Sequence, residues 1–312
     1  MKIIFFLVIF LRLLQGEILN TEIAPVENTT QFEGITLLDQ KILLFKEIGG
    51  LKFSEISDLA YDLKEKKLYL VSDEGKLFVF DASFSNKIET LSPVSSVKLV
   101  KSNGEKFKKW RKDSEGLALD NKGHLYVSFE GRAKIGRFDQ KGRMVKQYTL
   151  PKKLRNPKNY RSRNKSLEAL TWHPRHGLLT ATEWPLKHKY KKEQTIYTLD
   201  GKEWSFKAEA ESKSAVVAME VMDDGNLLVM ERSFTGLMNP LVITLKKIYL
   251  NGCKKKQMCQ SELLLKMNTH QGWNIDNFEG LARVGKHRYV IVSDDNDNFF
   301  QKTLLVYFEV SH

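Results

Sequence analysis

Acidic residues recur along this chain in pairs at a nearly constant spacing. The three clearest pairs are Glu115 with Glu130, Glu168 with Glu183, and Glu279 with Asp295. Carboxylates that gather in one place repel one another, so the group must be partly protonated or neutralised by a cation. Because these pairs offer oxygen ligands without His or Cys, they favour a hard ion. A wide site with a flexible number of ligands favours Ca²⁺ over Mg²⁺.

A short apolar segment recurs five times, usually opening on the first acid of a pair. Each copy is followed by a polar turn and by a second apolar segment that ends on a charged residue. The five repeats open at Ser57, Glu115, Glu168, Val217 and Glu279. Two further strand-like runs follow within each repeat, for example 133–139 and 144–150. Four short antiparallel strands per repeat of about 40–60 residues indicate the blade of a β-propeller.

The sequence therefore predicts an all-β fold. We expect a single β-propeller over residues 17–312, with five readable four-stranded blades and room for a degenerate sixth. The last repeat has only three strands and ends at 304–310, but a fourth is available near the N-terminus, at 35–38 or 41–46. This N-terminal strand should close the ring and leave no open sheet edge between the first and last blades.

The two inner strands of each blade determine where the acids lie. The start of the first strand and the end of the second lie at the same end of the channel, so the acids should meet at one mouth. The residues expected there as metal ligands are Glu74, Glu115, Glu130, Glu168, Glu183, Glu279, Asp294 and Asp295. Three of them, Glu115, Glu168 and Glu279, are also candidate catalytic bases. Arg232 replaces the second acid in the fourth repeat and is a candidate ligand for a substrate oxyanion. Alternatively, the acids cap strand ends or pair with nearby Lys and Arg side chains.

Three basic segments, 106–112, 152–165 and 187–192, adjoin the same ends of the inner strands. They predict a basic collar around the acidic centre, suited to a small anionic substrate or ligand. Aromatic residues lie among the bases, but there is no nucleic-acid-binding motif, and we expect no nucleic acid partner. The alternative is a solvated basic surface without a specific ligand. We expect a monomer.

The first sixteen residues have the organisation of a signal peptide. Lys2 precedes an apolar run at 3–11 that is too short to span a bilayer but suits a secretory leader. We expect residues 1–16 to be removed and the mature chain, without a transmembrane segment, to be periplasmic or secreted. In an oxidising compartment Cys253 and Cys259, which flank a short loop between two strand-like segments, should form a hairpin disulfide. Metal binding is the weaker alternative for this pair.

Composition and the missing motifs exclude several classes of protein. The chain has 312 residues, 42% of them hydrophobic and 28% charged, as in an ordinary globular protein. Two cysteines are too few for a disulfide-rich scaffold or a four-Cys zinc site. The net charge of +12 favours acidic partners. There is no G-x-S-x-G, H-E-x-x-H or P-loop motif, so we expect any chemistry to use metal-activated water with a carboxylate base.

Five motifs together resemble one known family. They are Ser57-Asp58-Leu59-Ala60-Tyr61-Asp62, Leu70-Val71-Ser72-Asp73-Glu74, Ser114-Glu115-Gly116-Leu117-Ala118, Leu228-Val229-Met230-Glu231-Arg232 and Phe278-Glu279-Gly280-Leu281-Ala282. In order and spacing they are similar to the phytase-like domain family, described as "esterase-like activity of phytase", from about Phe45 to Val310. The resemblance implies an exported propeller that hydrolyses phosphoric or other esters with Ca²⁺. Val217 departs from the pattern, because a polar residue is expected to open the fourth repeat.

The sequence leaves two classes of function open. The first is an exported, metal-dependent hydrolase of anionic esters, which would be phosphoric esters, carboxylic esters or lactones. The second is a non-catalytic propeller that uses the same mouth to bind an envelope or extracellular ligand. An enzyme should lose turnover on chelation and regain it with a divalent ion, whereas a binding module has no turnover to lose.

Overall fold

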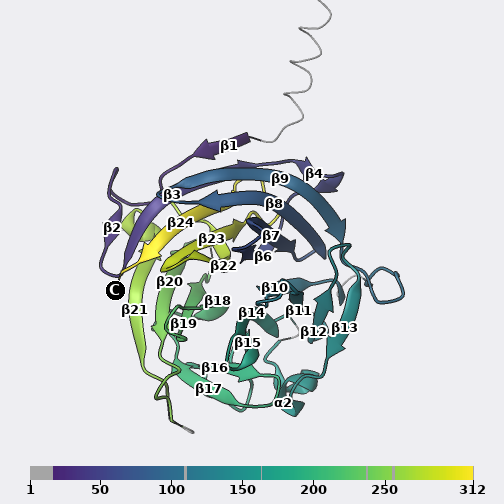
Figure 1. The fold of residues 1–312 in the computed structure, drawn as a ribbon. Helices are drawn as coiled ribbons and strands as arrows, with labels where there is room; N and C mark the ends of the chain where they lie inside the picture. The colour runs from purple at the N-terminus through teal and green to yellow at the C-terminus, as the bar shows by residue number, and fades with distance from the viewer. Residues whose placement is uncertain (1–16, 109–110, 163, 237, 255–256, 312) are drawn as a thin grey trace, which may run out of the picture.

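The computed structural model describes residues 17–108, 111–162, 164–236, 238–254 and 257–311. Figure 1 shows blades arranged around one axis, with strands β6, β10, β14, β18 and β22 innermost. Four blades are continuous in sequence, and their strands pair antiparallel in chain order. The first blade consists of β6 (Ile56–Asp62), β7 (Lys67–Ser72), β8 (Lys76–Phe84) and β9 (Ile88–Lys98), and the second of β10 (Ser114–Leu119), β11 (Leu125–Phe129), β12 (Lys134–Phe138) and β13 (Met144–Tyr148). The third consists of β14 (Leu167–His173), β15 (Gly177–Thr182), β16 (Glu193–Thr198) and β17 (Glu203–Lys207). The fourth consists of β18 (Ala215–Val221), β19 (Leu227–Ser233), β20 (Val242–Ile248) and β21 (Ser261–Asn268).

The fifth blade joins the two ends of the chain. It consists of β22 (Asn277–Gly285), β23 (Arg288–Asp294), β24 (Leu304–Val310) and the N-terminal strand β3 (Ile35–Leu44). In Figure 1 the purple β3 runs beside the yellow β24, and the two pair antiparallel with Ile35 opposite Val310. The predicted all-β propeller with five blades and an N-terminal closing strand is confirmed. There is no sixth blade among the described residues.

Short elements complete the chain. Strands β1 (Glu17–Asn20) and β2 (Gln31–Phe32) pair with β3, and β4 (Glu47–Ile48) pairs with β5 (Leu51–Lys52). The short helix α2 (Lys152–Arg155) and the 3₁₀ turns η2 (Pro157–Asn159) and η3 (Thr269–Gln271) lie in loops between blades. In the described part of the chain, no helix has both the length and the apolar character needed to cross a membrane.

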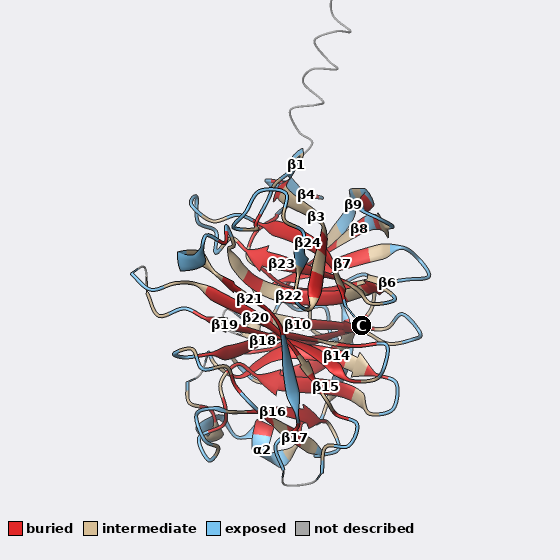
Figure 2. Ribbon diagram, turned by 90° about the vertical axis from the view of Figure 1, so that its left-hand side faces the viewer, coloured by how far each residue is buried: buried red, intermediate tan, exposed pale blue. Residues whose placement is uncertain are grey.

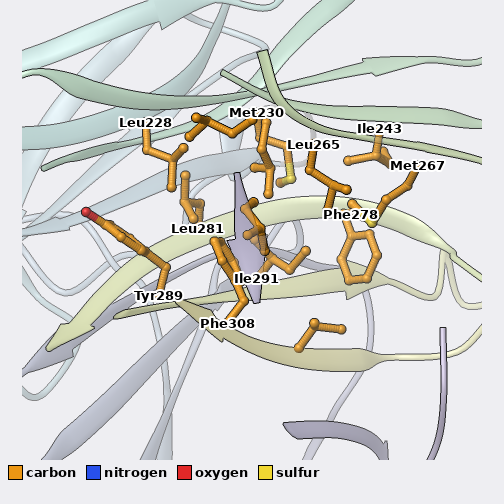
Figure 3. Packing of buried hydrophobic residues seen from close by; sticks show 14 of the residues in the cluster. Leu228, Met230, Ile243, Leu265, Met267, Phe278, Leu281, Tyr289, Ile291 and Phe308 are labelled. Carbon is orange, nitrogen blue, oxygen red and sulfur yellow. The ribbon is translucent and has the colours of Figure 1, made fainter. Parts of the chain in front are cut away.

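The core lies between neighbouring blades. Figure 2 shows the inner strands as buried and the connecting loops as exposed. The inner strands of each blade carry apolar side chains on both faces, because each face packs against a neighbouring blade. Figure 3 shows one such layer, in which Leu228 and Met230 of the fourth blade lie against Leu281 and Ile291 of the fifth. Burial of these faces holds the ring together.

The inner strands approach closely around the axis. A Cβ atom added to Gly280 would lie 2.8 Å from Cα of Asp58, so only glycine allows β22 to lie this near β6. Asp58 itself is buried, and its carboxylate accepts hydrogen bonds from the backbone N–H groups of Leu117 (2.7 Å) and Leu281 (3.1 Å). One side chain of the first blade thereby links the inner strands of both neighbouring blades.

Cys253 and Cys259 form a disulfide, with Cα atoms 5.0 Å apart. The pair lies in the loop between β20 and β21, which pair antiparallel from Val242 opposite Asn268 to Ile248 opposite Ser261. The predicted hairpin disulfide is therefore present. It leaves no free cysteine in the described chain.

Candidate functional site

A β-bulge at the start of each inner strand sets the direction of one side chain. In β10, Ser114 pairs with Phe129 and Leu117 with Val127, so Glu115 and Gly116 together face one partner residue. The same irregularity occurs at Glu168, Val217, Glu279 and Ser57 in the other blades. A bulge turns a side chain out of the regular alternation of the strand. It places this residue of each repeat at one end of the channel, which we call the acidic mouth.

One residue at or just after the end of each second strand belongs to a companion set at the acidic mouth. In three blades this residue is identified by a backbone hydrogen bond to the residue immediately before the first strand. The N–H of Glu130 donates to Asp113 O, the N–H of Glu183 to Ser166 O, and the N–H of Asp73 to Glu55 O. In the remaining blades the strand register identifies the equivalent residue. Glu231 pairs with Val216, so the next residue, Arg232, is the equivalent in the fourth blade. Ser293 pairs with Phe278, so the next residue, Asp294, is the equivalent in the fifth. The set is therefore Asp73, Glu130, Glu183, Arg232 and Asp294.

The expected alignment was wrong by one residue in two blades. Glu74 and Asp295 do not occupy the companion positions, which Asp73 and Asp294 hold instead. The register is fixed by the inner turns and bulges of each hairpin, and sequence spacing alone does not reveal them.

Glu74 and Asp295 each bind neighbouring protein groups. The Glu74 carboxylate pairs with Lys76 and with Lys112 (3.0 Å), and hydrogen bonds from these two ammonium groups lower its pKa to about 2. Oδ1 of Asp295 accepts the backbone N–H of Glu55 at 2.9 Å, so this side chain braces a loop. Their proposed role as metal ligands has less support than that of the other acids.

The remaining carboxyls converge in two overlapping groups. Oxygen atoms of Asp113, Glu115 and Glu130 lie within 4.8 Å of one another, and so do those of Glu130, Glu168 and Glu183. Glu130 belongs to both groups and is buried. The sequence did not single out Asp113, which precedes its strand and carries no repeat signal of its own.

Burial and mutual repulsion raise the pKa values of these carboxyls. Burial, followed by the charges of Glu183 and Asp113, raises the pKa of Glu130 to about 8. Burial and then Glu279 raise that of Asp294 to about 8, while burial and then Glu55 raise that of Asp73 to about 7. For Glu115 and Glu168, burial followed by neighbouring carboxylates places the pKa well above its usual value. The protein alone does not stabilise this group in its ionised form.

Two cations offset part of the negative charge. Arg232 donates to Asn277 and Glu279, and its second terminal nitrogen lies 3.4 Å from Oε1 of Glu183. The ammonium of Lys165 lies 2.6 Å from the other oxygen of Glu183. The guanidinium of Arg232 thus lies among the carboxyls of the acidic mouth and is already engaged with two of them.

Some carboxyl oxygens have no donor. Among the described residues, none donates a hydrogen bond to the side chain of Glu115 or Glu168. Oδ1 of Asp73 is buried without a partner. Several close oxygen ligands, without nitrogen or sulfur among them, fit a hard divalent cation. The residues that could hold one are Asp113, Glu115, Glu130, Glu168 and Glu183.

The predicted basic collar is only partly at this mouth. Lys165 and Lys112 contact acids there, as described above. Lys153, by contrast, pairs at 2.7 Å with Glu203 on the outer strand β17, and Tyr160 is buried with its hydroxyl donating to Leu154 O. Lys109, Trp110 and Arg163 lie outside the described residues.

A cavity of about 1110 Å³ opens at the other end of the channel. It is lined by the turns between first and second strands, which read as ordinary turns in the sequence. Its charged side chains are largely paired: Arg283 with Asp223 at 2.6 Å, and Arg175 with Asn251 at 2.7 Å. We call this end the opposite mouth. It lacks the unpaired carboxyl groups of the acidic mouth.

A five-bladed β-propeller whose channel opens onto a group of buried carboxyls is the class that fold and site define. The chain belongs to the phytase-like family, whose model, described as "Esterase-like activity of phytase", matches residues 51–297. The expected family is therefore confirmed. No curated protein matches the chain.

Solved structures with similar folds share little sequence with this chain. Virginiamycin B lyase from Staphylococcus aureus is 10% identical, with 95% of this chain and 99% of that chain covered and a TM-score of 0.42. The PQQ-bound aldose sugar dehydrogenase from Streptomyces coelicolor is 12% identical, with coverages of 96% and 99% and a TM-score of 0.43. A protein of unknown function from Bacteroides thetaiotaomicron is 12% identical, with coverages of 95% and 76% and a TM-score of 0.48. At these values the likenesses carry no inference about function.

Proposed function

We propose that this protein is an exported hydrolase of anionic esters, phosphoric esters first, which acts at the acidic mouth with a bound divalent cation, Ca²⁺. Membership of the phytase-like family supports the ester hydrolase class. The observation that carries the proposal is the state of Glu115 and Glu168. Their carboxyls are held close to other acids, receive no hydrogen bond from the described residues and have strongly raised pKa values.

The two overlapping carboxyl clusters would bind a cation with side chains from neighbouring blades. Asp113, Glu115 and Glu130 form one oxygen cluster, and Glu168 and Glu183 extend it through Glu130. Such an ion, when bound, supplies positive charge that polarises a phosphoryl or carbonyl oxygen and acidifies bound water. Binding would also stabilise the ionised form of these carboxyls, so calcium affinity should rise with pH.

The side chains differ in their freedom to move protons. Glu115 and Glu168 have no hydrogen-bond donor among the described residues, so either of them, once a bound cation has ionised it, could accept a proton from water. Asp73, with a pKa of about 7, is poised for the same role near neutral pH. Glu279 accepts hydrogen bonds from Arg232 and Asn277 and is better suited to fixing the guanidinium. We propose that Arg232, held this way, presents positive charge to a substrate oxyanion.

Export is part of the proposal. The disulfide between Cys253 and Cys259 suits an oxidising compartment. The leader expected at residues 1–16 lies outside the described residues. We propose a periplasmic or secreted, monomeric protein. Mass spectrometry of the N-terminus after expression in a bacterial host would show whether residues 1–16 are removed.

A substrate panel tests the activity. Chelator-treated protein is assayed on p-nitrophenyl phosphate, inositol hexakisphosphate, p-nitrophenyl acetate and a lactone, each without metal, with Ca²⁺ and with Mg²⁺. We expect turnover on a phosphoric ester with Ca²⁺, lost on chelation. Glu168→Gln should lower kcat, whereas Glu65→Gln, an exposed acid at the opposite mouth, should not. Metal-independent turnover would overturn the metal role, and no turnover on any ester would favour the non-catalytic binding propeller.

A further inference from the structure

We propose that the acidic-mouth face of the propeller docks on an anionic lipid surface. The first observation is where the most exposed hydrophobic side chains lie. Four large hydrophobic residues are more than four-fifths exposed: Phe299 at 96%, Met238 at 90%, Phe300 at 87% and Tyr190 at 84%. A single exposed apolar side chain is ordinary on a protein surface, whereas several of them gathered on one face indicate a surface that meets something apolar.

All four belong to the same type of loop. Tyr190 lies between β15 and β16, Met238 between β19 and β20, and Phe299 and Phe300 between β23 and β24. These loops begin at the ends of second strands. Glu183, Arg232 and Asp294 lie at the same strand ends, so the loops are on the acidic-mouth face. The inner strands β14, β18 and β22 are consecutive around the ring. The four side chains thus project from three neighbouring blades on one face.

These side chains are not packed against the fold. Phe299 and Phe300 contact each other edge-to-face, with ring centroids 5.6 Å apart. None of the four lines the cavity at the opposite mouth or the smaller cavity beside Phe84 and Tyr307. With so little of their area covered, these side chains protrude into solvent. Separate protrusions suit a soft interface, where each apolar side chain inserts independently between lipid headgroups.

Basic side chains accompany these protrusions. Six of them are exposed and have no acidic partner among the described residues: Arg132, Lys187, Lys191, Lys192, Lys213 and Lys302. They lie on the loops that leave second strands, or on the loop that enters β18, at the same end of the ring. On the loops around the mouth, Asp297 is paired with Lys52 and Glu211 with Lys266. The carboxyls without a cationic partner lie inside the acidic mouth, so the exposed unpaired charge of the described loops around it is positive.

Aromatic and Met side chains beside unpaired lysines are complementary to an anionic bilayer surface. Lysines near such a surface are attracted to its headgroups, and the apolar side chains enter the headgroup–acyl boundary. An acidic protein or polymer would satisfy the lysines but would leave the protruding Phe and Met side chains in water. The lipid surface therefore accounts for both observations. Docking of this kind would hold the acidic mouth against the headgroups.

Vesicle flotation tests the proposal. The mature chain is mixed with vesicles of phosphatidylcholine alone or with about one-third phosphatidylglycerol, at low and high salt. We expect flotation only with the anionic vesicles, weakened by salt. Phe299→Ser with Phe300→Ser should lower the partition coefficient about tenfold or more. The matched control is Leu63→Ser, an exposed apolar residue at the opposite mouth, which should leave it unchanged.

Charge is tested in the same way. Lys191→Glu with Lys192→Glu should abolish flotation, whereas Lys64→Glu with Lys122→Glu at the opposite mouth should not. Absence of flotation for the wild-type chain, or equal losses in test and control variants, would overturn the proposal. Flotation that depends on the lysines but not on Phe299 and Phe300 would indicate attraction of the lysines to anionic groups without insertion of the apolar side chains, and would also overturn the proposal.

Insertion is read out directly by fluorescence. Phe300→Trp should be quenched by lipids brominated on the acyl chain, and Leu63→Trp should not. Absence of quenching at residue 300 in vesicle-bound protein would refute insertion. Docking does not depend on hydrolysis, so Glu115→Gln with Glu168→Gln should float like the wild type. A failure of the proposed activity and a failure of docking are thus separable.

Discussion

Glu130→Gln tests the electrostatic state of the acidic mouth most directly, because Glu130 belongs to both carboxyl groups. Its pKa rises from 4.5 to about 8 in the folded protein, chiefly through burial. The folded state therefore binds this proton more tightly than the unfolded state does. The stability that it contributes is complete below pH 4.5 and is lost as the pH rises toward 8. In metal-free protein, stability should thus fall between these two values.

The size of the effect follows from linkage. Each pH unit over which Glu130 is neutral when folded and ionised when unfolded costs about 1.4 kcal/mol. At pH 7 the loss from this group is therefore about 3 kcal/mol, against less than about 1 kcal/mol at pH 5. Gln does not ionise, and its side-chain oxygen can still accept the backbone N–H of Ser166, which lies 3.2 Å from Oε1. Glu130→Gln should be more stable than wild type at pH 7 and close to it at pH 5.

The assay is urea denaturation of chelator-treated proteins at both pH values, followed by repetition with Ca²⁺. A ligand present at a hundred times its Kd stabilises the folded state by about 2.7 kcal/mol. Wild type should show this gain at pH 7, and Glu130→Gln should show little of it. Glu65→Gln, exposed at the opposite mouth, serves as the control and should behave like wild type. A Glu130→Gln protein that is less stable than wild type at both pH values, or that gains equally from Ca²⁺, would refute the reasoning.

Further predictions concern the disulfide, the buried guanidinium and the packing of the inner strands. Cys253 and Cys259 should show no free thiol in denaturant without reductant, and reduction should cost less than about 3 kcal/mol because the loop is short. Arg232→Lys should lower the unfolding free energy by about 2 kcal/mol in urea, since one ammonium cannot meet all the partners of the guanidinium. A fall in kcat/KM of about 30-fold or more per folded molecule would assign Arg232 to the substrate, and unchanged turnover would leave it a structural role. In urea denaturation, Gly280→Ala should lower the unfolding free energy by about 1–3 kcal/mol, whereas Gly285→Ala, whose added Cβ would have its nearest neighbour at 3.5 Å, should cost less.

The sequence revealed the blades because each repeat must bury both faces of its inner strands. That requirement leaves an apolar–turn–apolar pattern at regular intervals, and the strand missing from the last repeat pointed to β3. The pairing register of the strands was harder to predict, because a bulge or a longer turn moves a side chain by one position without altering the apolar–turn–apolar pattern. This is why Glu74 was expected where Asp73 lies. Asp113 and Asn277 were missed because Asp113 precedes its strand, Asn277 is the first residue of its strand, and neither carries a periodic signal.

Closure of the fifth blade by β3 has a consequence for how the molecule is made. The strand synthesised near the beginning of the chain must wait for β24, which is synthesised almost last. Until then, among the described strands, β3 has the short β1 and β2 as its partners, and the fifth blade does not yet join the two ends of the chain. Contacts between such distant segments form slowly, and an unpaired strand is prone to pair with other chains. A chain that crosses a membrane N-terminus first would therefore need protection from aggregation until its final residues emerge, and loss of those residues would open the propeller.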